Sequence, residues 1–111
     1  MRSIFQKGTL EIGKIAKKIQ RTGKIKLLIF SGFFIGQESE TDIFLVGEVD
    51  KKKLSDYISR ELDFAQEIKY TIFSENAFFQ RLDHNDKFTK NFLSNSKNMV
   101  LVDKVSQKFD E

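Results

Sequence analysis

The stretch SGFFIGQESETDIFLVGEVD, residues 31–50, joins two strongly apolar segments and decides how the chain around it folds. It opens with a Ser-Gly pair, has a second glycine at position 36, and continues into a run of acidic residues. Glycine tolerates backbone conformations that other residues avoid, so this composition is typical of a tight turn. The stretch predicts either a decorated hairpin or a loop that holds a phosphate and a metal ion.

The apolar segments on either side of this turn favour β-strands. KIKLLIF (24–30) and DIFLVG (42–47) are short, rich in isoleucine, valine and phenylalanine, and bounded by glycine. Short continuous apolar runs of this kind are typical of strands that are buried on both faces. We therefore expect both strands in the centre of one sheet.

Helical periodicity appears before the first strand and after the second. One helical stripe contains Ile12, Ile15, Ala16 and Ile19. Their spacing predicts an amphipathic helix over residues 9–22, which Gly23 is expected to end in a left-handed conformation. A second helix is predicted after Asp50, whose carboxylate can accept hydrogen bonds from first-turn amides.

The next segment returns to strand alternation. Residues 67–73 (EIKYTIF) predict a strand with Ile68, Tyr70 and Ile72 on one face. Ser74 follows directly and is expected to cap a short helix.

A further helix and a last strand are predicted near the C-terminus. Asp83 or Asn85 is expected to open the helix. The residues expected on its inner face are Phe88, Phe92 and Leu93. Residues 98–103 (NMVLVD) predict a strand, and residues 104–111 a frayed tail.

These elements follow one another in the order α β β α β α α β. The strand, helix, strand passage from 42 to 73 favours an α/β (α+β) fold. We expect a mixed sheet of about four strands, with helices packed on it in two or three layers. Residues 1–111 are expected to form one domain, with a basic leading helix over 1–23 and a core over 24–103.

Length and composition restrict the class of protein. A chain of 111 residues with 40% hydrophobic residues can bury one modest core. The lack of cysteine excludes disulfides, thiolate zinc sites and cysteine nucleophiles, and it fits a reducing compartment. No apolar run approaches the roughly 20 residues that span a bilayer. We therefore expect a cytoplasmic protein that does not associate with membranes.

Positive charge is concentrated at the start of the chain. The first 30 residues contain eight lysines and arginines and one acidic residue, Glu11. Within the predicted helix the cations are Lys14, Lys17, Lys18 and Arg21. They could contact the phosphates of a nucleic acid, or they could form the solvated face of a helix packed on the sheet. Both interpretations remain open.

From about residue 24 to residue 103 the chain resembles a nucleotidyltransferase domain of the DNA polymerase beta superfamily. The similar version is the one found C-terminal to winged helix-turn-helix domains in bacterial and archaeal regulators. In active members a strand leads to a Gly-Ser turn, Asp-x-Asp follows on the next strand, and a later strand supplies a third carboxylate. These groups hold Mg²⁺ against a nucleoside triphosphate in a two-metal mechanism.

The matching positions are Ser31-Gly32 at the Gly-Ser turn, Gly36 and Glu38 after it, and Glu40-Thr41-Asp42 at Asp-x-Asp. The order of the turn residues is reversed, and the first aspartate is replaced by Glu40. Lys69 aligns best with the third carboxylate, and a charged lysine cannot ligate a cation. Glu67 lies on the same face of the predicted strand and takes that place if the register slips by two residues.

The resemblance implies a degenerate, non-catalytic domain that binds a nucleotide or a protein partner in a regulatory role. In it, Ser31, Gly32, Gly36 and Lys69 would line the phosphates. Glu40 and Asp42 would hold any Mg²⁺ that accompanies a nucleoside triphosphate. A homodimer is the simplest protein partnership.

Two alternatives remain open. One is an active, minimal nucleotidyltransferase in which Glu40, Asp42 and Glu67 are catalytic and a nucleoside monophosphate passes to a hydroxyl of protein or RNA. The other is a nucleic-acid-binding protein that uses the basic leading helix.

The remaining candidate residues favour structural roles. His84 lacks a partner at metal-ligand spacing and is predicted to be a turn residue. Asp83 and Asp86 are better placed as helix caps than as metal ligands. The phenylalanines Phe73, Phe78, Phe79, Phe88 and Phe92 are predicted to form core, with base stacking as the alternative.

Overall fold

The computed structural model describes the backbone of residues 4–62 and 67–105, and the side chains from residue 11 onward within those ranges. The elements are α1 (Ile4–Gln20), β1 (Gly23–Phe30), a 3₁₀ turn η1 (Gly32–Ile35), β2 (Ile43–Val49), α2 (Lys51–Glu61), β3 (Tyr70–Phe73), α3 (Glu75–Asp83), α4 (Lys87–Leu93) and β4 (Met99–Asp103). This order of helices and strands is the predicted one, and the α+β fold class is confirmed.

The strands form one mixed sheet with the order β3-β2-β1-β4. β1 pairs antiparallel with both β2 and β4, whereas β2 pairs in parallel with β3. The two most apolar strands therefore occupy the centre of the sheet, as predicted. The parallel pair requires a crossover, which α2 supplies.

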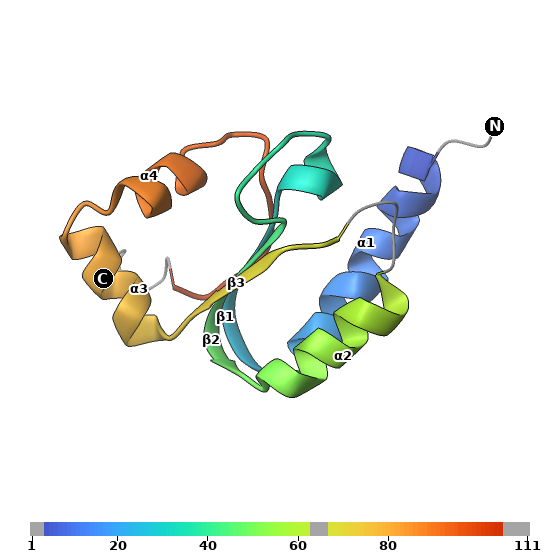
Figure 1. Cartoon of the computed structure of the whole chain (residues 1–111), viewed down its shortest axis with the longest axis horizontal. Helices are drawn as coiled ribbons and strands as arrows, with labels where there is room; N and C mark the ends of the chain where they lie inside the picture. The colour runs from blue at the N-terminus through green and yellow to red at the C-terminus, as the bar shows by residue number, and fades with distance from the viewer. Residues whose placement is uncertain (1–3, 63–66, 106–111) are drawn as a thin grey trace.

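Helices cover both faces of this sheet, so the domain has three layers (Figure 1). One face packs on α1 and α2 through Leu28, Phe30, Ile43 and Leu45. The opposite face packs on α3 and α4 through Leu27, Ile29, Phe44 and Val46. Successive side chains of a strand point to opposite faces, which explains why continuous apolar runs were needed in both central strands.

Local sequence signals account for two helix starts. The Asp50 carboxylate accepts hydrogen bonds from the amides of Lys52 and Lys53, both at 3.1 Å, at the start of α2. The Ser74 hydroxyl accepts one from the amide of Ala77 at 3.1 Å at the start of α3. Both caps were predicted, because side-chain oxygens satisfy amides that have no partner within the helix.

The predicted bounds of the first helix were wrong at both ends. α1 covers Ile4–Gln20 instead of residues 9–22. Gly23 has no positive φ and belongs to β1. The helix ends at Gln20, and the turn after it is closed by Thr22, whose backbone amide and hydroxyl both donate to the carbonyl of Ile19 at 3.0 and 2.6 Å. Glycine is needed at position 23 for another reason, since a Cβ there would meet the backbone of Glu48.

The predicted strand over 67–73 is shorter in the structure. β3 covers only Tyr70–Phe73. On the predicted inner face, Ile68 is buried and Ile72 packs against the core, but Tyr70 is 38% exposed. Tyr70 begins β3, which lies at the edge of the sheet that the described strands form, so its side chain has neighbouring strand residues on one side only.

Three further details near the C-terminus differ from the prediction. Neither Asp83 nor Asn85 opens α4; Asp86 does, and its carboxylate accepts from the amide of Thr89 at 3.0 Å. Leu93, expected on the inner face, is exposed because α4 ends there. In the predicted tail, Val105 is buried, and the rest of that prediction (106–111) lies outside the described residues.

In the described part of the chain, the helices are all too short or too polar to cross a membrane.

Candidate functional site

The turn that follows β1 is closed by hydrogen bonds within the protein. η1 begins at Gly32, with φ of 51°, and ends at Gly36, with φ of 71°. The amide of Phe34 donates to Ser31, that of Gly36 to Phe33, and that of Gln37 to Gly32, at 3.0, 3.3 and 2.9 Å. These amides therefore point to partners inside the turn rather than to a shared external anion.

Asp42 lies immediately before β2 and connects three segments of the chain. Its Oδ1 accepts a hydrogen bond from the amide of Phe33, and its Oδ2 accepts one from the amide of Lys69, both at 2.8 Å. Its backbone carbonyl accepts from the amide of Ser31, and its own amide donates to the carbonyl of Lys69, again both at 2.8 Å. The residue is only 1% exposed, so its carboxylate is a buried clamp between the turn, β2 and the segment before β3.

Gly32 is required by this clamp. A Cβ at position 32 would meet Oδ1 of Asp42, and the positive φ is unfavourable for other residues. Gly36 also has a positive φ, but a Cβ there would meet nothing within 4 Å. The first glycine of the motif therefore makes room for a specific carboxylate, whereas the second only closes the turn.

The other acidic candidates lie in a different environment. Glu40 and Glu67 are exposed, in contrast to the buried Asp42, and Glu38 is exposed as well. Glu40 and Asp42 both precede β2, which begins at Ile43. Within residues 11–62 and 67–105, no three histidine, aspartate or glutamate side chains are grouped so that they could hold a metal ion.

Lys69, which aligns with the third carboxylate, is exposed and makes a contact across the loop. Its ammonium group donates to the backbone carbonyl of Ser39 at 2.6 Å. Its backbone amide is one of the two donors to Asp42. The residue therefore holds the acidic loop and the β3 segment together at the position where the resemblance expects a metal ligand.

Ser31 has a partner that the sequence did not reveal. It is 1% exposed, and its hydroxyl donates to Oδ1 of Asn98 at 2.7 Å. The side-chain amide (Nδ2) of Asn98 in turn donates to the backbone carbonyl of Phe92 at 2.8 Å. Nearby, the side-chain amide (Nδ2) of Asn95 donates to Oε1 of Gln37 at 2.9 Å. A lone asparagine before an apolar strand carries no signal of such a contact, because the partner lies 67 positions away.

A cavity of about 360 Å³ lies beside these asparagines. Its walls include the apolar side chains of Leu27, Ile29 and Phe78, together with Asn95 and Asn98. It opens on the sheet face that packs on α3 and α4. None of Ser31, Glu40 and Asp42 contributes to its lining, so it does not coincide with the site that the sequence predicts.

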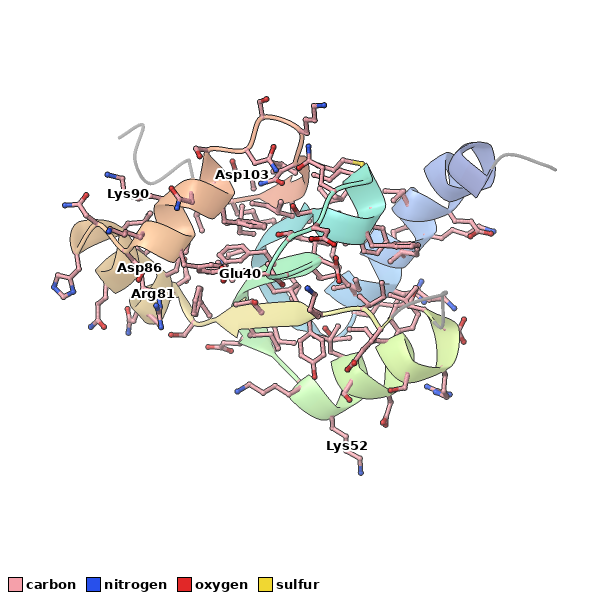
Figure 2. The ribbon with its side chains drawn as sticks, turned by 45° about the horizontal axis from the view of Figure 1, so that its top comes forward. Glu40, Lys52, Arg81, Asp86, Lys90 and Asp103 are labelled. Atoms are coloured by element: carbon pink, nitrogen blue, oxygen red, sulfur yellow. The ribbon has the colours of Figure 1, made fainter. Side chains whose placement is uncertain are left out.

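The remaining candidates have structural roles. His84 ends α3 and is exposed, as predicted for a turn residue. All five phenylalanines of the predicted core belong to the cluster around Phe44, whose ring contacts those of Phe73, Phe78 and Phe92. Asp86 caps α4 and forms a salt bridge of 3.4 Å with Arg81 (Figure 2). The backbone hydrogen bond from Thr89 is the main reason that the pKa of Asp86 is lowered.

Comparison with models of known protein families, with curated proteins and with solved structures gave no match. The resemblance to nucleotidyltransferases therefore stays a prediction that depends on the residues and the geometry above.

Proposed function

We propose that this chain is a degenerate nucleotidyltransferase-like domain that does not catalyse transfer and acts by binding in a regulatory role. The proposal is supported by the order of elements and by the glycine turn between two central, antiparallel strands. The observation that carries it is the state of Asp42. Both of its carboxylate oxygens accept backbone hydrogen bonds, and the residue is 1% exposed.

The residues do not fit a two-metal centre. Such a centre needs carboxylates that converge on one accessible point, with oxygens free to bind the cations. Asp42 offers an enclosed carboxylate, whereas Glu40 and Glu67 are exposed. Lys69 brings a positive charge to the loop beside them. This combination gives no support to an active enzyme.

The turn also offers little to a phosphate. A phosphate-binding loop presents several backbone amides that have no partner in the protein. Here the amides of Phe33, Phe34, Gly36 and Gln37 all donate within the protein. The Ser31 hydroxyl donates to Asn98. This arrangement favours a protein partner over a nucleotide as the regulatory ligand.

A transfer assay tests the loss of catalysis. The full chain is incubated with labelled nucleoside triphosphates, Mg²⁺ or Mn²⁺, and protein or RNA acceptors. We expect no label on any acceptor. Transfer that disappears in Glu40→Gln would refute the proposal, because Glu40 is exposed and its substitution leaves the fold intact.

A thermal-shift titration tests whether the regulatory ligand is a nucleotide. A nucleotide that binds only the folded chain at a hundred times its Kd stabilises it by about 2.7 kcal/mol. For 111 residues this raises Tm by roughly 12 °C. We expect no such rise with any nucleoside triphosphate, with or without Mg²⁺. A saturable rise that requires Ser31 or Lys69 would instead assign a nucleotide to the turn.

A further inference from the structure

The C-terminal end of α1 and the first turn of α2 meet at one end of the domain. The amide of Asp50 donates to the carbonyl of Thr22 at 2.7 Å, and Gly23 pairs with Val49 where β1 and β2 begin and end. Both helices pack on the same sheet face, side by side (Figure 1). Residues about 30 positions apart in the sequence are therefore neighbours at this end.

This juxtaposition gathers positive charge that the sequence places in two separate runs. We call the resulting surface the basic pole; its cations are Lys17, Lys18, Arg21, Lys24, Lys51, Lys52 and Lys53. All seven are exposed. Figure 2 shows Lys52 extending away from the body of the domain. The second run, directly after Asp50, adds three cations to the four that residues 17–24 supply.

Few acidic groups neutralise the basic pole. Within the described residues, none of its cations forms a salt bridge. The nearby carboxylates are those of Glu48, of Asp50, which caps α2, and of Glu11 and Glu61, which lie near the Tyr57 ring that Lys18 contacts, so the seven cations remain in excess. The basic pole therefore attracts polyanions.

We propose that the basic pole binds the phosphate backbone of double-stranded nucleic acid without reading its sequence. This inference is independent of the proposed function above. The lysine and arginine side chains of the basic pole can each neutralise a phosphate, and such contacts give affinity without base specificity.

The surroundings of the basic pole favour a duplex over other anionic partners. The exposed large apolar side chains of the described chain, Tyr70, Leu93 and Val100, lie on β3, α4 and β4. A membrane surface or a protein partner would need apolar residues beside the charges. A single strand would need exposed aromatic rings for base stacking, and the nearby Tyr57 is half-buried, with the Lys18 ammonium 5.8 Å from its ring centre.

Fluorescence anisotropy of a labelled duplex of mixed sequence, titrated with the full chain at several salt concentrations, tests the proposal. If about five cations contact phosphates, the slope of log affinity against log salt is about −4.5. Affinity then falls roughly 500-fold between about 50 mM and 200 mM salt. Two duplexes of unrelated sequence are expected to bind equally.

The variant Lys51→Glu/Lys52→Glu removes two contacts. Carboxylates in the first turn of a helix are favourable, so this variant is expected to fold normally. We expect the slope to fall in size to about 2.7 and the affinity at low salt to drop at least about tenfold. Lys87→Glu/Lys90→Glu is the matched control, because it makes the same charge change on another helix capped by an aspartate.

The control residues lie on α4, across the sheet from the basic pole, and Figure 2 shows Lys90 far from Lys52. The control is expected to keep the slope and to bind within about threefold of the wild type, since screening limits the reach of a surface charge. Equal losses in both variants would overturn the proposal, as would no duplex binding at low salt. Tighter binding to single strands or to vesicles rich in phosphatidylserine would overturn it as well.

Discussion

Replacing Asp42 by asparagine distinguishes a structural clamp from a metal ligand. The substitution keeps the size of the side chain and removes its charge and one acceptor oxygen. In the wild type the two oxygens accept from the amides of Phe33 and Lys69. In Asp42→Asn one of these amides faces an NH₂ group and loses its partner inside a site that is 1% exposed.

The expected loss of stability follows from these two hydrogen bonds. Each hydrogen bond to a charged acceptor contributes about 1.5–3 kcal/mol, and a buried donor left without a partner costs about 1–3 kcal/mol. Because the other bond persists in weaker form, we expect Asp42→Asn to lower the free energy of unfolding by about 3 kcal/mol. For 111 residues this lowers Tm by roughly 13 °C.

Thermal and urea unfolding followed by far-UV circular dichroism measure this loss. Glu40→Gln is the control, because Glu40 is exposed, and it should change stability by less than about 0.5 kcal/mol. The reasoning is refuted if Asp42→Asn is as stable as the wild type or more stable. That result is expected of a carboxylate held near other acidic groups to bind a cation, since removing its charge relieves repulsion.

Four further substitutions test the turn and the cap of α4. Gly36→Ala is expected to lower the free energy of unfolding by about 1 kcal/mol, because the left-handed φ is unfavourable for alanine. Gly32→Ala is expected to lower it by about 2 kcal/mol more, because the buried Asp42 carboxylate must move. Urea unfolding compares the two variants. Ser31→Ala leaves Oδ1 of Asn98 without its donor and should lower stability by about 1–2 kcal/mol in the same assay, whereas an unchanged midpoint would contradict this role. Asp86 has a lowered pKa in the folded chain, so its contribution is complete above the ordinary aspartate pKa of about 4 and is lost as pH falls through the folded pKa. The Tm difference between wild type and Asp86→Asn should therefore close in acid, and a constant difference across the pH range would show that the carboxylate charge has no part in the cap.

The sequence predicted those features that short-range physics controls. Continuous apolar runs placed β1 and β2 in the centre of the sheet, because only strands covered on both faces need them. Asp50 and Ser74 were predicted as caps, since a side-chain oxygen before an amphipathic segment reaches the first free amides.

Boundaries were predicted less well where a distant segment decides them. Gly23 suggested a helix end, but it is glycine because the backbone of Glu48 lies against it in the sheet. Leu93 matched the apolar spacing of α4 yet is exposed, because it is the last residue of the helix. Asp86 rather than Asn85 opens α4, and Asn85 instead takes a positive φ of 54° in the connection.

In the candidate site, too, the sequence predicted the residues but not the contacts that they make with distant segments. Its residues were predicted from the sequence, and of these Gly32 and Asp42 lie together at the turn. Their chemical state was not visible there, because the partners of Asp42 are backbone amides, which every residue except proline has. The contact of Asn98 with Ser31 and the closeness of the α2 lysines to the end of α1 were missed for a related reason: both depend on segments that the fold brings together.

By itself, the amino-acid sequence determined the order of the elements, the mixed central sheet and the glycine turn beside an aspartate, because periodicity, capping and backbone freedom act between near neighbours. Only the tertiary structure decided that this aspartate is enclosed and that two separate lysine runs form one basic surface. Burial and charge density depend on which distant segments pack together. A hydrogen bond from a backbone amide leaves no signal in the sequence, because the residue that donates it can carry almost any side chain.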